Sequence, residues 1–364
     1  MATARSPAEP VVGGTVVVVP DTTIRAARSA LAQAGSARTL SAILLLLLAP
    51  HPGAARTIEV GEGKPVHGLI EAVEKAEPGD TIHLGPGEYY ECASIGVPDL
   101  TIQGEGPTTV ITDRTCAGKA ILIGRADNLT IRDLVLARAR VPDMNGAGVR
   151  MEARGFVAER VRFQNDQVGI LGGNSDEIRI SDCVFEAGGV AGEHPSNAVW
   201  ISNANRLVIE RSTFTGVKGG QIASAAAVTE LTGNHIETGT EPGAGHAVII
   251  LGGRLLMHDN TVVLGPNPPP RNAAVAVNGQ GAVLDGNRME NTTGQPAALL
   301  LDWMHATPVL GTNTVPPGDT VATTSGVWRH RVGGIARAAL GEARSAVGAA
   351  LGGAKGTIRS MLGR

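Results

Sequence analysis

The stretch Leu-Thr-Ile-Arg-Asp-Leu-Val-Leu at residues 129–136 decides the fold, because variants of it return along the chain. They read Ile-Arg-Ile-Ser-Asp-Cys-Val-Phe at 178–185, Leu-Val-Ile-Glu-Arg-Ser-Thr-Phe at 207–214 and Leu-Leu-Met-His-Asp-Asn-Thr-Val at 255–262. Each has two apolar residues two positions apart and another five positions later. The second apolar residue anchors a series spaced by 22–29 residues: Ile102, Ile131, Ala158, Ile180, Ile209, Leu231, Met257, Leu284 and Leu310. A repeat of this length with period-2 alternation predicts one stranded coil per repeat.

A second strand is visible in each coil, and glycine and asparagine turns separate it from the first. These strands are expected at 120–123, 148–151, 169–172, 198–201, 221–224, 247–250, 274–277 and 298–301. Identical registers repeated in one chain direction mean parallel strands stacked along an axis. The sequence therefore predicts an all-β protein, a right-handed parallel β-helix of about ten coils.

Two side-chain columns follow from this register. Three residues after the anchor come the asparagines of four consecutive coils: Asn234, Asn260, Asn287 and Asn313. Stacked amides in a buried turn can hydrogen-bond along the stack. Five residues after the anchor come Phe163, Phe185 and Phe214, which we interpret as a core column.

The composition agrees with many short strands joined by turns. The 364 residues include 49 Gly and 21 Pro but only four Phe, three Trp and two Tyr, while hydrophobic residues make up 43%. Such a chain is too apolar for intrinsic disorder and too rich in Gly and Pro for a long helical bundle. The net charge of −3 and the lack of a basic, aromatic surface give no reason to expect a nucleic-acid partner.

The two ends of the chain differ from the repeats. Residues 1–55 end in an apolar run, Leu40–Ala49, that follows arginines and precedes small residues, the order of a secretory signal. The β-helix is expected over 56–317, with a linker at 318–332. Residues 333–364 place apolar side chains on one helical face and are basic, so they predict an amphipathic helix that docks on the barrel or lies on a membrane surface. An extracytoplasmic protein, periplasmic or secreted, is expected.

The N-terminal part resembles a known family. An amphipathic segment at 66–76 precedes Pro-Gly-Asp-Thr-Ile at 78–82, and Leu-Thr-Ile-Gln-Gly-Glu-Gly-Pro follows at 100–107. This is similar to the entrance of the pectate-lyase-like superfamily, in which a short helix caps the barrel before the first coil. The resemblance covers residues 57–317. It implies the fold but leaves function open, because that fold hosts lyases, epimerases, hydrolases, esterases, tailspikes and adhesins.

The resemblance also bears on the cysteines. In such a fold Cys92 and Cys116 lie about one coil apart, and adjacent rungs are about 4.8 Å apart, which is compatible with a disulfide. We expect Cys92 and Cys116 to be bonded. Cys183 occupies the position that later coils give to asparagine, so a buried free thiol is expected there.

The outward residues of the second strands indicate what the barrel offers to a ligand. They are expected to be Leu122, Arg150, Leu171, Trp200, Ala223, Ile249, Ala276 and Leu300. Only Arg150 is charged, which is a poor row for catalysis and is also compatible with an apolar face covered by something else.

Polar residues gather on one side of the middle coils: Asp143, Asn145, Arg150, Glu152, Asp166, Gln167, Glu193, His194, Trp200 and Lys218. As a site, Arg150 would bind a substrate carboxylate and Trp200 would stack on a sugar. Lys218 or His194 would be the base, and Asp143, Glu152 or Asp166 the acid or a metal ligand. Asn145 and Gln167 would complete the binding surface. The competing interpretation is turn capping and ordinary surface charge.

We expect a protein that binds an acidic polysaccharide as its partner. If it is also an enzyme, the reaction is expected to be of the lyase or C5-epimerase type. The alternative is a non-catalytic cell-envelope scaffold or adhesin-like binding protein. Ca²⁺ is a cofactor that the resemblance allows, but the aspartates form no calcium-loop repeat and no metal residues are predicted.

Overall fold

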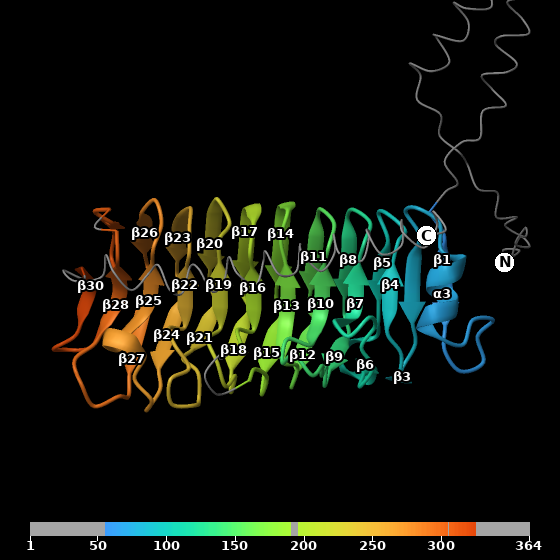
Figure 1. The fold of residues 1–364 in the computed structure, drawn as a ribbon, viewed down its shortest axis with the longest axis horizontal. Coiled ribbons are helices and arrows are strands. Elements are labelled where there is room, and N and C mark those ends of the chain that lie inside the picture. The colour runs from blue at the N-terminus through green and yellow to red at the C-terminus, as the bar shows by residue number, and fades with distance from the viewer. Residues whose placement is uncertain (1–54, 191–195, 305, 325–364) are drawn as a thin grey trace, which may run out of the picture. The chain divides into compact units, whose positions relative to one another are not determined.

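The computed structural model describes residues 55–190, 196–304 and 306–324. Their strands form three parallel sheets, here called A, B and C, and each coil contributes one strand to each sheet in turn. The coils stack along one axis, with the N-terminal coil at one end and β30 at the other (Figure 1). The predicted right-handed parallel β-helix of about ten coils is confirmed.

Sheet A holds the first strand of each repeat. Its strands are β1 (Thr57–Val60), β2 (Thr81–Leu84), β5 (Thr101–Gln103), β8 (Leu129–Arg132), β11 (Phe156–Glu159), β14 (Ser175–Ser181), β17 (Ala204–Glu210), β20 (Val228–Thr232), β23 (Arg254–His258), β26 (Ala282–Asp285) and β29 (Val309–Leu310). All nine predicted anchors pair with one another in this register, from Ile102 with Ile131 to Leu284 with Leu310.

Sheets B and C follow in each coil. Sheet B contains β3 (Gly87–Tyr89), β6 (Thr109–Thr112), β9 (Val135–Ala137), β12 (Arg162–Gln164), β15 (Val184–Glu186), β18 (Thr213–Thr215), β21 (His235–Glu237), β24 (Thr261–Leu264) and β27 (Arg288–Asn291). Sheet C contains β4 (Ala93–Ile95), β7 (Ala120–Gly124), β10 (Ala147–Met151), β13 (Val168–Gly172), β16 (Val199–Ile201), β19 (Ile222–Ser224), β22 (Val248–Ile250), β25 (Ala273–Val277), β28 (Ala298–Asp302) and β30 (Thr320–Thr324). Two short 3-10 helices, η1 (Gly106–Thr108) and η2 (Pro270–Asn272), lie in the connections.

Both predicted side-chain columns are confirmed. Phe163, Phe185 and Phe214 stack with ring centroids 4.6 Å apart, close to the spacing of neighbouring strands. In the turn between sheets A and B, the Nδ2 of each asparagine donates to the Oδ1 of the next, at 2.9 Å, from Asn234 through Asn260 and Asn287 to Asn313. The column satisfies buried backbone N–H groups as well, because each Oδ1 also accepts from the backbone of the preceding coil.

Cys183 begins this polar column. Its backbone N–H donates to Ser212 Oγ, and Ser212 N–H in turn donates to Asn234 Oδ1. The thiol is buried and free, as predicted. Burial raises the pKa of Cys183 to about 12, so the group is a neutral thiol at physiological pH.

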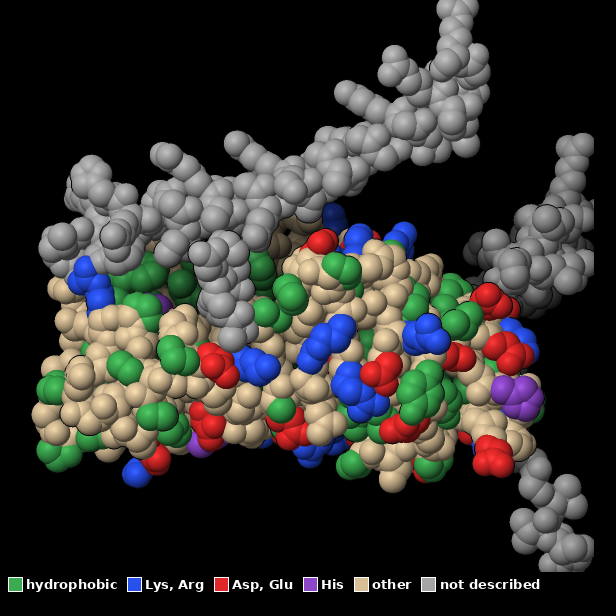
Figure 2. All heavy atoms as spheres, turned by 60° about the horizontal axis from the view of Figure 1, so that its bottom comes forward, with side chains coloured by type: hydrophobic (Ala, Val, Ile, Leu, Met, Phe, Trp, Pro, Cys, Tyr) green, Lys and Arg blue, Asp and Glu red, His purple; other side chains and the backbone are tan. Residues whose placement is uncertain are grey.

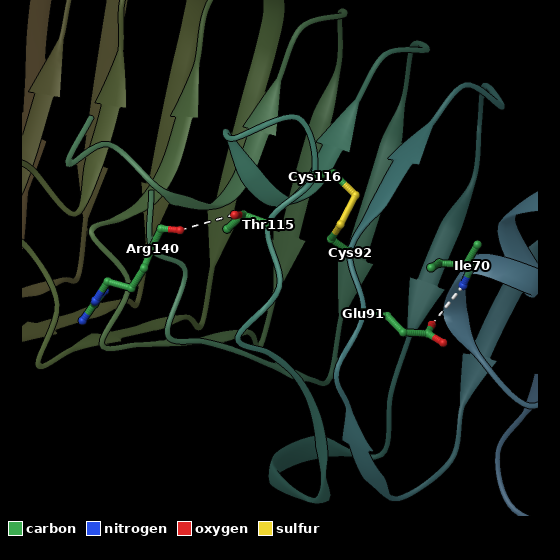
Figure 3. The surroundings of a disulfide bond; sticks show 6 residues. All are labelled: Ile70, Glu91, Cys92, Thr115, Cys116 and Arg140. Atoms are coloured by element: carbon green, nitrogen blue, oxygen red, sulfur yellow. Dashed lines mark hydrogen bonds between the residues drawn. A yellow bond between two sulfur atoms is a disulfide. The ribbon is translucent and has the colours of Figure 1, made fainter. Parts of the chain in front are cut away.

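The N-terminal end is closed by α3 (Leu69–Lys75), which buries Leu69 and Ala72 against the first coil. The predicted disulfide between Cys92 and Cys116 is present, with Cα atoms 5.5 Å apart (Figure 3). Next to it, Glu91 accepts a hydrogen bond from Ile70 N–H, and Thr115 donates one to the carbonyl of Arg140. This segment therefore ties the helix to the first three coils.

The β-helix extends beyond the boundary expected at residue 317. β30 pairs with β28 inside the segment interpreted as a linker, so sheet C continues to Thr324. The expected signal segment at 1–55, apart from residue 55, and the tail at 333–364 lie outside the described residues and remain predictions.

Candidate functional site

The outer face of sheet C carries the predicted row, with two corrections. Strand pairing places Ile123, Arg150, Leu171, Trp200, Ala223, Ile249, Ala276 and Leu301 in one line. Leu122 and Leu300, predicted to point outward, instead pair with Val149 and Val275 and lie in the main core. β7 and β28 are apolar on both faces, so their alternation carries no information about which residues point inward.

Four charged residues meet at the start of this row. Lys119 precedes β7 and Arg125 follows it, while Arg150 lies in β10 and Glu152 follows that strand. Glu152 receives Lys119 Nζ at 2.5 Å and Arg150 Nε at 3.6 Å on Oε1, and Arg125 Nε lies 3.7 Å from Oε2. We call these residues the cationic cluster, because three positive charges surround one negative charge.

The strands and the disulfide position this cluster. Gly124 pairs with Met151, so the next residues, Arg125 and Glu152, leave neighbouring strands side by side. Lys119 closes a tight turn in which its N–H donates to the carbonyl of Cys116, and Ala117 and Gly118 both have positive φ. The disulfide at Cys116 anchors that turn to the preceding coil.

The charges decide the protonation of Glu152. Burial by itself raises its pKa, but the hydrogen bond from Lys119 and the charges of Lys119, Arg125 and Arg150 outweigh burial and hold the pKa below its usual range. Glu152 is therefore an ionised carboxylate and a weak base at neutral pH. The cluster keeps a net positive charge that favours the binding of a further carboxylate.

Trp200 lies on the same row as Arg150, two strands further along and separated from it by Leu171. Two rung spacings are about 10 Å. The partly exposed indole therefore offers an aromatic surface near the cluster but out of its reach.

The corner between sheets B and C holds the other predicted residues. Gln167 is buried, and its Oε1 accepts from the N–H groups of Val141 and Gly146 at 2.8 Å, so it organises the loop that carries Asp143 and Asn145. Asp143 is exposed, and Asn145 is partly buried. These contacts explain Gln167 as part of the framework of the loop.

Asp166 is buried beneath the same corner. Its Oδ1 accepts from Ala139 N–H at 2.7 Å, and its Oδ2 has no hydrogen-bond partner among the described residues. Burial raises the pKa of Asp166 well above its usual range, and the bond from Ala139 opposes this only in part. The side chain lies inside the fold, out of contact with solvent.

The remaining predicted residues are not in the cluster. Lys218 is exposed on the turn before β19, three strands from β10, which corresponds to about 14 Å along the axis. Glu193 and His194 lie outside the described residues. The structure thus brings together Arg150 and Glu152, with Trp200 nearby, and separates Lys218 from them.

Sequence analysis missed Lys119 and Arg125. Both lie just outside the strand, where period-2 alternation no longer applies. Aligning β7 with β10 would have revealed Arg125, because it takes the position that Glu152 holds in the next coil.

On the side shown in Figure 2, charged side chains gather over the middle and N-terminal coils, while the C-terminal coils show fewer. Within residues 55–190, 196–304 and 306–324, no three His, Cys, Asp or Glu side chains come together as a metal site requires. In the same part of the chain, no helix has the length and apolar character needed to cross a membrane.

Fold and site together define a parallel β-helix protein with a cationic cluster at one end of an apolar outer face. No protein-family model matches the chain, and no curated protein is similar to it in sequence. Pectin methylesterases and alginate lyases are among the solved structures to which the chain is similar. A pectin methylesterase from Aspergillus niger has 12% identity and a TM-score of 0.43, covering 76% of this chain and 92% of that one.

Two alginate lyases are similar as well. A PL6 family alginate lyase has 16% identity and a TM-score of 0.48, covering 75% of this chain and 40% of that one. The alginate lyase from Paenibacillus sp. str. FPU-7 has 16% identity and a TM-score of 0.44, covering 75% and 99%. At these identities, what this chain binds has to be inferred from its own residues.

Proposed function

We propose that the protein binds an acidic polysaccharide along the outer face of sheet C, with a uronate carboxylate held by Arg150 beside Lys119 and Arg125. The observation that carries the proposal is the surplus of positive charge around Glu152. The Arg150 side chain is only 22% exposed, so its charge is poorly screened and favours a carboxylate partner.

The geometry of the coils suits a polymer. A saccharide laid along the axis advances about 5 Å per sugar, close to the spacing of neighbouring strands. With one sugar carboxylate at Arg150, a sugar two units further on reaches Trp200, whose ring can pack against an apolar sugar face.

Lyase or C5-epimerase chemistry would need a base and an acid at the same sugar. Glu152 is ionised and surrounded by cations, Asp166 is buried, and Lys218 is about 14 Å from Arg150 along the axis. Binding is therefore the function that the described residues support best. The same experiment tests turnover with His194, the other predicted base.

The test compares the binding of polygalacturonate, alginate and uncharged dextran by the full chain. Arg150→Ala is expected to weaken binding of the acidic polymers by about tenfold or more, because a charge-assisted bond is lost. Arg160→Ala is the matched control, because Arg160 is paired with Asp133 at the corner between sheets A and B.

Equal losses in both variants, or equal binding of dextran, would contradict the proposal. Unsaturated products in the same mixtures would establish lyase turnover. Parallel samples with Ca²⁺ and with a chelator test the Ca²⁺ cofactor that the family resemblance allows.

A further inference from the structure

The turn that carries Lys119 is held in an unfavourable backbone conformation. It runs from Cys116 to Lys119 and is closed by the hydrogen bond from Lys119 N–H to the Cys116 carbonyl, at 2.9 Å. Its two central residues, Ala117 and Gly118, have φ values of 51° and 61°. Glycine adopts positive φ freely but alanine does not, and turns with two such residues prefer Asn-Gly. The turn therefore needs attachments outside itself to keep this shape.

Attachments on both sides fix the turn to neighbouring coils. On the N-terminal side, the disulfide joins it to Cys92 in the preceding coil. On the C-terminal side, the carbonyl of Lys119 accepts from Ala147 N–H in the following coil, at 2.9 Å. The hydrogen bond from Thr115 Oγ1 to the Arg140 carbonyl, just before the turn, is longer, at 3.3 Å, and exposed (Figure 3). The disulfide is thus the covalent attachment on the N-terminal side.

These attachments decide where the Lys119 side chain points, because they hold the backbone before and after its Cα. With the disulfide open, the turn keeps its link to Ala147 but loses its covalent link to the preceding coil, and Ala117 can relax to negative φ. Lys119 Nζ, which contacts Glu152 Oε1 at 2.5 Å, is then free to leave it. The cationic cluster would lose one of its three positive charges.

We propose that the Cys92–Cys116 disulfide positions Lys119, so that opening it with a dithiol reductant releases Lys119 from Glu152. A consequence, which rests on the proposed function, is that an acidic polysaccharide binds more weakly to the reduced protein than to the oxidised one.

The disulfide is open to this chemistry. Cys92 and Cys116 are both partly exposed, so a reductant can reach the bond. One thiolate of the reductant attacks a sulfur of the disulfide, and its second thiol then displaces the protein and closes a disulfide within the reductant. The protein gains two electrons and two protons and is left with two cysteine thiols. Cys183 is buried, and burial raises the pKa of its thiol to about 12, so it does not enter the exchange.

The positioning is tested by acylation of lysines in the full chain, with the rate at each lysine measured by proteolysis and mass spectrometry. In the double variant Cys92→Ser/Cys116→Ser, Lys119 is expected to react about three- to fivefold faster, because its amine is no longer held on Glu152. Lys75 is the internal control, since it pairs with Glu71 within α3 and the disulfide does not hold it. Both cysteines lie outside the main core, so the fold is expected to survive.

A further substitution separates positioning from general loosening of the first coils. Ala117→Asn, added to the double variant, creates Asn-Gly, which favours positive φ without help from outside the turn. It should return the rate at Lys119 to that of the unmodified chain. An unchanged rate at Lys119 in the double variant, an equal rise at Lys75, or a failed rescue would each overturn the proposal.

The consequence for binding is tested with dithiothreitol and polygalacturonate. The reduced chain is expected to bind about threefold more weakly than the oxidised chain, and reoxidation should restore the affinity. Equal affinities would overturn this consequence. If neither form binds, the proposed function is wrong, and the acylation experiment alone decides whether the disulfide positions Lys119.

Discussion

Sheets A and C are built from the same coils, but their outer faces differ in how they treat charge. On sheet A, Arg206 lies between Glu177 and Glu230 at 2.9 and 2.7 Å, and Arg179 joins Glu177 to Glu210. At the adjoining corner, Arg160 pairs with Asp133 and Arg211 with Asp182. Sheet A thus pairs its charges across neighbouring coils.

Sheet C instead carries an apolar row and a cluster with surplus positive charge. The backbone repeat therefore does not determine which face is available to partners. A face whose charges are paired gains little from a ligand, whereas a surplus of positive charge favours an acidic partner.

The largest effect is expected from placing a charge on the apolar row. Leu301→Asp should lower the free energy of unfolding by about 3 kcal/mol, because it puts a carboxylate into a buried apolar cluster. Thr130→Asp on the outer face of sheet A should change it by less than about 0.5 kcal/mol. Chemical denaturation measures both, and equally small losses would show that the two faces are alike.

A smaller effect is expected from removing the single negative charge of the cluster. Glu152→Gln should strengthen polygalacturonate binding by about fivefold, or about 1 kcal/mol, because Glu152 competes with the ligand for the cations. Glu230→Gln on sheet A should leave binding unchanged. Weaker binding by Glu152→Gln would instead mean that Glu152 positions the cations.

The smallest effect concerns how stability depends on pH. Its sign is opposite for Asp166, at the corner between sheets B and C, and for Asp133, at the corner between sheets A and B. The pKa of Asp166 is raised in the folded protein, so the native state holds this proton more tightly than the unfolded chain does. The resulting contribution to stability is fully present below the pKa of the unfolded state, and it is lost as the pH rises through the pKa of the folded state. Asp166→Asn should therefore gain thermal stability relative to the unmodified chain between pH 4 and pH 8.

Asp133 provides the control for this effect. Arg160 holds the pKa of Asp133 below its usual range, so its contribution is present above the unfolded pKa and is lost as pH falls through the folded one. Asp133→Asn should therefore lose thermal stability relative to the unmodified chain as pH rises from 3 to 7. The same slope in both variants would contradict these pKa directions.

The sequence was sufficient for the interior because a coil repeat fixes its own register. Once Ile131 and Ile180 are aligned, the register alone places Phe163 in the phenylalanine column and Asn234 in the asparagine column. The disulfide followed from the spacing of one coil in the fold.

The outer face was less predictable. The outward residues of β7 and β28 are Ile123 and Leu301, one position after the residues predicted. Both strands are apolar on both faces, so the sequence does not distinguish the inward side from the outward side. Lys119 and Arg125 belong to turns, whose contacts depend on which strand ends stand side by side. The burial of Asp166 and Gln167 could not be inferred from their polarity, because each is held by backbone groups of a neighbouring loop.

Within the described residues the two ends of the solenoid are unequal, and from this we expect unfolding to have a direction. Stacked coils contact only their neighbours, so loss of structure starts where an end is least protected. At the first coil, α3 and the disulfide protect the end, whereas in β29 Val309 and Leu310 are 61% and 43% exposed. The coils should peel from β29 inward, which leaves the disulfide-linked N-terminal coils as the template on which the rest is rebuilt.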